Sequence, residues 1–187
     1  MNLYGRLQKN PIIAAVKDEA ALARAISSDC EVLFLLAGDI CTICQTVEAI
    51  KAADKMVYIH IDLMEGFGRD KSAIRYIKEY IAPDGVITTR APLAKMAREL
   101  AVPVIQRLFL VDALSLETGI QSVRQVHPDA VELMPGLMPE VITRLCAAVV
   151  IPPVIAGGLI TRKEHIIAAL GAGAVGVSTS KEELWRM

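Results

Sequence analysis

Short apolar runs alternate with amphipathic segments along the whole chain. The runs are rich in β-branched residues and are bounded by turn-forming residues, which is typical of buried parallel strands. Eight of them predict strands, at 11–16, 32–38, 56–62, 85–90, 102–109, 130–136, 153–158 and 174–180. Helical spacing of apolar residues predicts helices between them, at 19–27, 42–53, 70–80, 93–100, 115–126, 139–148 and 162–170.

The spacing of these units favours a closed barrel. The predicted strand centres lie about 23 residues apart, which suits βα units with short loops. Eight alternating units predict an α/β fold, a small (β/α)8 TIM-type barrel, and no linker divides the chain, so residues 1–187 are assigned to a single domain. Only residues 181–187 follow the last strand, so the eighth helix is expected to be truncated or missing. The N-terminal segment or a second copy of the chain, in a homo-oligomer, could cover the side left open near strands 8 and 1.

Composition is compatible with this barrel and argues against a membrane-spanning, secreted or strongly basic protein. Hydrophobic residues make up 53% of the chain but aromatic residues only 4%, which indicates an extensive aliphatic core. The longest uncharged run, at 145–161, is too short and too interrupted to span a membrane. The first ten residues lack the apolar region of a signal peptide, so we expect a cytoplasmic protein. The net charge of −1 leaves only a local basic surface for any contact with nucleic acid.

Small residues and hydroxyls end the seventh and eighth predicted strands. Small residues let a ligand approach backbone N–H groups, and the loops after these two strands commonly bind phosphate in (β/α)8 barrels. The residues predicted to bind a phosphate group are Gly136, Gly157, Gly158, Ser178, Thr179 and Ser180. The same pattern is also compatible with ordinary turns.

Charged residues near the ends of other strands are expected at the same mouth of the barrel. Strand alternation places His60, Asp62 and Glu132 inside. Arg107 is assigned inward as well, with Gln106 facing the helices, because an arginine between sheet and helices would be the costlier arrangement. The residues predicted to pair with one another or to bind the hydroxyls of a polyol are Lys17, Asp62, Glu65, Arg107 and Glu132.

These acid–base groups leave two functions open. They fit pure binding, and they fit equally an isomerase, lyase or synthase acting on a phosphorylated sugar or polyol. The acidic residues come from separate elements without a local motif, so we predict neither a metal site nor a cofactor. Cys41 and Cys44 form a C-x-x-C pair without a second ligand pair, and we interpret them as reduced core thiols.

Basic residues recur with helical spacing on two neighbouring predicted helices. The candidates for a contact with RNA are Lys71, Arg75, Lys78, Lys95 and Arg98. Such spacing is also typical of a solvated helix face.

Six short motifs, in chain order, resemble those of the glycerol uptake operon antiterminator regulatory proteins. They are residues 60–66 (HIDLMEG) with 69–70, 84–89 (DGVITT), 106–109 (QRLF) with 112 and 115–117, 132–136 (ELMPG), 156–160 (AGGLI), and 177–180 (VSTS) with 184–185. The resemblance covers nearly the whole chain. It implies a non-enzymatic sensor of glycerol 3-phosphate on a phosphate-binding barrel. It also implies that the ligand-bound protein acts on leader mRNA so that transcription passes a terminator.

Overall fold

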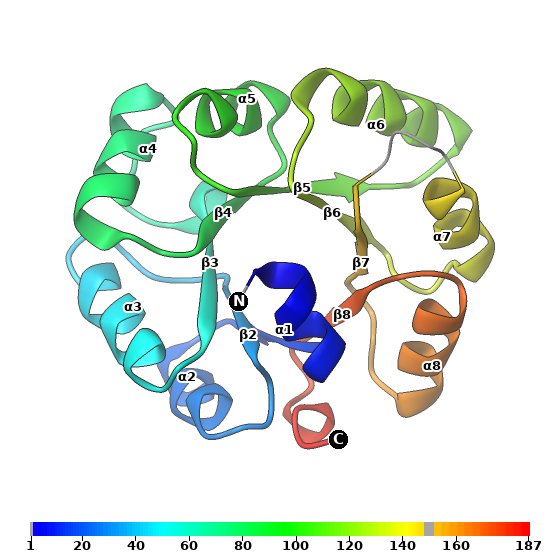
Figure 1. Ribbon diagram of the computed structural model, residues 1–187, viewed down its shortest axis with the longest axis horizontal. Helices are drawn as coiled ribbons and strands as arrows, with labels where there is room; N and C mark the ends of the chain where they lie inside the picture. Colours follow the sequence, from blue (N-terminus) through cyan, green and yellow to red (C-terminus); the bar gives the residue numbers. More distant parts are fainter. Residues whose placement is uncertain (1, 148–151) are drawn as a thin grey trace.

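The computed structural model describes residues 2–147 and 152–187. Eight parallel strands form a closed ring in chain order, with β8 hydrogen-bonded to β1 (Figure 1). The strands are β1 (Ile12–Val16), β2 (Val32–Leu35), β3 (Met56–His60), β4 (Gly85–Thr88), β5 (Val104–Phe109), β6 (Ala130–Met134), β7 (Val154–Ala156) and β8 (Gly176–Thr179). The predicted (β/α)8 barrel is confirmed, although every strand is shorter than expected.

An outer layer of helices covers the ring (Figure 1). It consists of α2 (Glu19–Ile26), α3 (Ile43–Ala52), α4 (Lys71–Tyr76), α5 (Ala91–Glu99), α6 (Ala113–Val126), α7 (Pro139–Cys146) and α8 (Lys163–Gly171). Asp18, Asp70 and Asp112 cap the first turns of α2, α4 and α6 by accepting backbone N–H groups. The expected helix over 70–80 continues beyond α4 as a π-helical turn, η2 (Ile77–Ile81). The expected end of the helix over 139–148 lies outside the described residues.

The N-terminal segment forms a helix that sequence periodicity did not predict. This helix, α1 (Leu3–Lys9), lies within the ring at the amino-terminal ends of the strands (Figure 1). Leu7 is buried there beside Gly176, and Arg6 forms ion pairs with Glu31 and Asp54. The segment therefore closes one end of the barrel. The alternative in which it covers the side near β8 and β1 is wrong.

The chain after β8 covers that side instead. It forms a single 3-10 turn, η3 (Glu182–Leu184). This confirms the prediction that the helix after β8, the eighth of a (β/α)8 barrel, is truncated. Trp185 is buried, and its indole N–H donates to the carbonyl of Thr179. Arg24 of α2 forms an ion pair with Glu182, so the turn is tied to its neighbouring helix.

Two apolar layers fill the molecule. The inner cluster includes Phe34 and Tyr58, whereas Val57 and Ile59 pack in the outer cluster between sheet and helices. The alternation predicted for β3 is thus confirmed. Val175 packs against the inner cluster, because it precedes β8 at the entry to the barrel. Each fully buried aliphatic side chain contributes about 1.5–3 kcal/mol to folding. Across residues 2–147 and 152–187, we find no helix with the length and apolar character of a membrane span.

Candidate ligand-binding site

A cavity of about 250 Å³ opens at the carboxyl ends of the strands. Six of the residues predicted to bind a ligand line it: Lys17, Arg107, Gly158, Ser178, Thr179 and Ser180. They come from the ends of β1, β5, β7 and β8, which the closed ring brings together although they are far apart in the sequence. We call this space the mouth cavity.

Gly158 and Ser180 present backbone donors at the mouth cavity. Their N–H groups donate to no acceptor within the described residues. Gly158 has a φ of +73°, a left-handed conformation that glycine adopts without strain. The hydroxyls of their neighbours are already engaged, since Ser178 donates to Glu132 and Thr179 donates to the carbonyl of Ile160. The backbone, more than the hydroxyls, is thus available to an anion here.

Gly136 and Gly157 were predicted to bind phosphate, but their N–H groups are bonded within the barrel. The N–H of Gly136 donates to the carbonyl of Gly157, and the N–H of Gly157 donates to that of Leu133. A Cβ at Gly157 would lie 2.5 Å from Oε1 of Glu132 and 2.6 Å from Oγ of Ser178. These glycines allow close packing beneath the cavity, and their N–H groups are not free to bind a ligand.

A buried ion pair forms the floor of the site. Nε of Arg107 donates to Oε2 of Glu132 at 2.6 Å, and Oγ of Ser178 donates to Oε1 at 2.5 Å. Arg107 is 6% exposed and Glu132 is fully buried. Nη2 of Arg107 is buried as well and has no hydrogen-bond partner in the described part of the chain. Leaving such a charged donor unpaired is costly, so this atom is suited to an anionic or hydroxyl-bearing ligand.

Asp62 and Glu65 do not line the mouth cavity, which corrects their predicted placement beside Arg107. Asp62 lies in a 3-10 turn, η1 (Ile61–Leu63), where Oδ2 accepts the hydroxyl of Thr88 and the N–H of Thr89. It therefore joins the ends of β3 and β4. Glu65 is exposed, and its backbone bonds to the loop after β2. The turn at 61–63 ends the strand before the alternation reaches Asp62.

His60 lies close enough to Arg107 and Asp62 for both charges to act on it. Burial, and then the charge of Arg107, lower its pKa to about 4, so the imidazole is neutral at pH 7. Nδ1 of His60 lies 3.9 Å from Oδ2 of Asp62 and has no hydrogen-bond partner among the described residues. A neutral ring beside Arg107 leaves the arginine as the dominant charge on the inner side of the mouth.

Lys181 and Leu159 are among the lining residues that the sequence did not predict. Lys181 adds a second exposed cation beside Lys17. It directly follows the predicted Ser180, and that position was the signal for it. Leu159 also lines the cavity, although its side chain is 68% exposed and its φ is +60°. Nothing in the sequence indicates this strained, exposed leucine.

The predicted RNA-binding residues do lie on adjacent helices, but several are already paired. Lys71 of α4 forms an ion pair with Glu99 of α5 at 2.5 Å. Arg98 pairs with Asp129, and Lys78 donates to the carbonyl of Leu100. Among residues 2–147 and 152–187, Arg75 and Lys95 form no ion pair within 4 Å. The free charge on this surface is smaller than the sequence indicated.

The cysteine interpretation needs a correction. Cys41 is exposed and Cys44 half-buried, so neither is a core thiol, because both lie at the solvent-facing start of α3. Burial, and then the charge of Glu48, which accepts from the Cys44 thiol, raise the pKa of that thiol. Within the described ranges, no three His, Cys, Asp or Glu side chains gather to hold a metal ion.

Comparisons with known proteins agree on one family. The family model for glycerol-3-phosphate responsive antiterminators matches residues 12–185. The protein YgcP of Escherichia coli K12 is 40% identical over 187 residues, covering 100% of this chain and 97% of the relative.

Solved structures point the same way. A glycerol uptake operon antiterminator regulatory protein from Listeria monocytogenes superposes with a TM-score of 0.89 at 32% identity, covering 94% of this chain and 95% of its own. A related protein from Thermotoga maritima superposes with a TM-score of 0.84 at 29% identity, covering 94% and 98%. Aldolases such as QR15, at 13% identity and a TM-score of 0.70, share the fold alone.

Proposed function

Because the chain belongs to the glycerol-3-phosphate responsive antiterminator family, we propose that it binds glycerol 3-phosphate and then acts on leader mRNA of glycerol-utilisation genes. In this proposal the barrel is a sensor, and occupancy of the mouth cavity is the signal. The action on RNA and on the terminator follows ligand binding.

One observation carries the ligand proposal: Arg107 lines the mouth cavity, and its buried Nη2 has no hydrogen-bond partner among the described residues. A phosphorylated polyol offers this atom an acceptor, and the fork geometry of a guanidinium suits phosphate and hydroxyl oxygens. The free N–H groups of Gly158 and Ser180 and the ammonium groups of Lys17 and Lys181 would bind the phosphate. Glu132 holds Arg107 in place from below.

Direct binding tests this proposal. Calorimetry should detect glycerol 3-phosphate binding to the parent protein. Arg107→Lys keeps a positive charge beside Glu132 but removes the guanidinium fork, and it should weaken binding about tenfold or more. Arg90→Lys is the matched control, because Arg90 precedes α5, lies beside Asp62 and does not line the mouth cavity. Equal loss in both variants, or none in either, would contradict this site.

The regulatory half needs RNA. In this proposal, affinity for a 5′ leader RNA should rise when glycerol 3-phosphate saturates the protein. Because coupling between two sites is reciprocal, the RNA should then raise the affinity for glycerol 3-phosphate by the same factor. Phosphorus NMR of the protein incubated with glycerol 3-phosphate alone distinguishes a sensor from an enzyme. We expect an unchanged phosphorus spectrum, and a new phosphorus signal would instead support a barrel enzyme acting on a phosphorylated polyol.

A further inference from the structure

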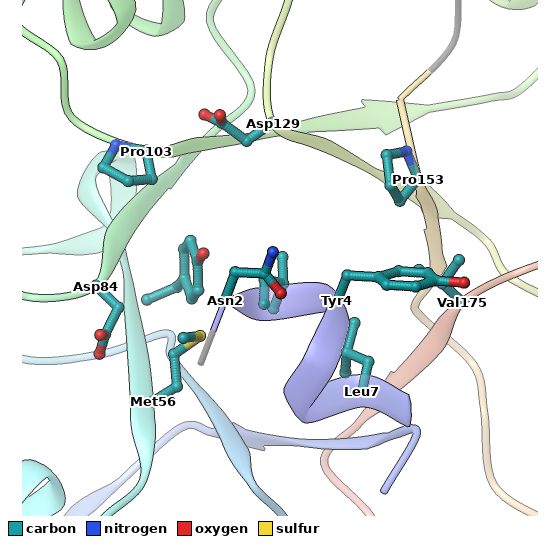
Figure 2. A pocket seen from close by; sticks show the side chains of 11 residues that line it. Asn2, Tyr4, Leu7, Met56, Asp84, Pro103, Asp129, Pro153 and Val175 are labelled. Carbon is teal, nitrogen blue, oxygen red and sulfur yellow. The ribbon is translucent and has the colours of Figure 1, made fainter. Parts of the chain in front are cut away.

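A second cavity, of about 420 Å³, lies at the opposite end of the barrel from the mouth (Figure 2). It lies between α1 and the turns that lead into the strands, and we call it the lower cavity. We propose that the lower cavity is a binding site for a small organic cation, a primary amine with an apolar body. This site is separate from the mouth cavity, and it does not depend on the function proposed above.

Most of the wall of the lower cavity is apolar. Leu3, Leu7, Met56, Pro103 and Val175 contribute side chains to it. Figure 2 shows Leu7 on α1 and Met56 at the entry to β3 facing this space. A cavity of this size with a few polar groups in an apolar lining is typical of small-molecule sites.

The charged side chains in the described lining are both acidic. Asp84 and Asp129 lie on the rim, and the lining includes no Lys or Arg within the described residues (Figure 2). Oδ2 of Asp84 accepts the N–H of Val57, whereas its other oxygen has no partner in residues 2–147 and 152–187. Asp129 is fully engaged by Val104 and Arg98. Asp84 therefore supplies the free acceptor for a cationic group.

Tyr58 adds a polar group inside the cavity. It is 3% exposed, and its hydroxyl makes no hydrogen bond to any residue that the structure describes. Burial, and then the charges of Asp84 and Asp129, raise the pKa of this hydroxyl. The hydroxyl is thus neutral at pH 7, and its oxygen can accept from an ammonium group. A cationic group complements a lining whose charged residues are Asp84 and Asp129 and whose buried tyrosine hydroxyl has no partner among the described residues, which neither an anion nor a hydrocarbon does.

Helix α1, which covers the lower cavity, is anchored to the barrel by its C-terminal half. Leu7 packs into the barrel, and Arg6 pairs with Glu31 and Asp54. The first turn, with Asn2 and Tyr4, extends over the cavity (Figure 2). The space is preformed, so a ligand does not have to bear the cost of opening it.

Methionine-methyl NMR can locate a ligand in either cavity. Met56 lines the lower cavity and Met134 lines the mouth cavity, so each reports on one site. Met56→Leu assigns the first signal. We expect 2-phenylethylammonium to shift the Met56 signal and not that of Met134, whereas glycerol 3-phosphate should do the reverse. A shift of Met134 alone by the amine would overturn the proposal.

The charge of the probe tests the proposed chemistry, first on the parent protein and then on two variants. At pH 7 the amine should bind about tenfold more tightly than 2-phenylethanol, and phenylacetate should not bind. Asp84→Asn removes the charge but keeps an acceptor for Val57, and it should abolish this preference. Glu117→Gln, on the exposed face of α6, loses the same charge elsewhere and should not change it. Equal affinity for amine and alcohol, or a preference that Asp84→Asn retains, would refute an organic-cation site.

Discussion

Gly158 offers the sharpest test of the mouth cavity. A Cβ on this residue would meet the side chain of Met134 at 3.4–3.7 Å, which is ordinary van der Waals contact. The left-handed φ of +73° costs any other residue roughly 1 kcal/mol of stability. Gly158→Ala should therefore fold with a modest loss of stability and still bind glycerol 3-phosphate. Gly158→Asp bears a similar backbone cost and adds a carboxylate beside the proposed phosphate position.

The added charge sets the size of the effect. Two like charges about 4 Å apart repel by about 4 kcal/mol at an effective dielectric constant of about 20, which corresponds to about a thousandfold in affinity. Calorimetry on both variants, with thermal unfolding as a check on folding, measures this difference at one pH and ionic strength. If Gly158→Asp bound glycerol 3-phosphate within tenfold of Gly158→Ala, the phosphate would lie elsewhere.

Three further predictions concern the hydroxyls, the buried histidine and the RNA surface. Glycerol 3-phosphate should bind more tightly than ethyl phosphate in calorimetry, since a site that bonds hydroxyls rejects analogues without them; equal affinities would mean that only phosphate is recognised. The pKa of His60 falls from 6.5 to about 4 on folding, so its contribution to stability is complete above pH 6.5 and is lost towards pH 4. Between pH 7 and 5 the parent should lose about 2 kcal/mol more unfolding free energy than His60→Gln in urea titrations, and equal losses would contradict the neutral imidazole. Arg75→Gln with Lys95→Gln should weaken RNA binding and flatten its salt dependence more than Lys71→Gln with Arg98→Gln, whose charges are already paired. Unchanged affinity and salt dependence in the first pair would exclude this surface.

The barrel was predictable because its signals are local and repeated. Alternation within β3 and β6 placed His60 and Glu132 correctly, and a cost argument placed Arg107. The short chain after β8 predicted the missing helix. These inferences need only a strand period and the burial cost of charge.

Other features depend on contacts that no local pattern encodes. The turn at 61–63 removes Asp62 from the mouth and bonds it to β4. The N–H of Gly157 is used in the ladder to β6, although the sequence shows only a small residue at the end of a strand. Helix α1 has only one fully buried side chain, Leu7, so its periodicity was too weak to predict it.

The packing of Trp185 gives the protein an optical probe of its own. Trp185 is the single tryptophan of the chain, it is 1% exposed, and its indole N–H bonds to the carbonyl of Thr179 at the mouth cavity. Its fluorescence therefore arises from one buried environment, and the carbonyl that accepts its indole N–H belongs to the residue before Ser180. Any ligand that displaces the backbone at 179–180 changes the polarity and hydrogen bonding of that fluorophore. Occupancy of the site can thus be followed by emission from the unlabelled protein, in real time and at micromolar concentration.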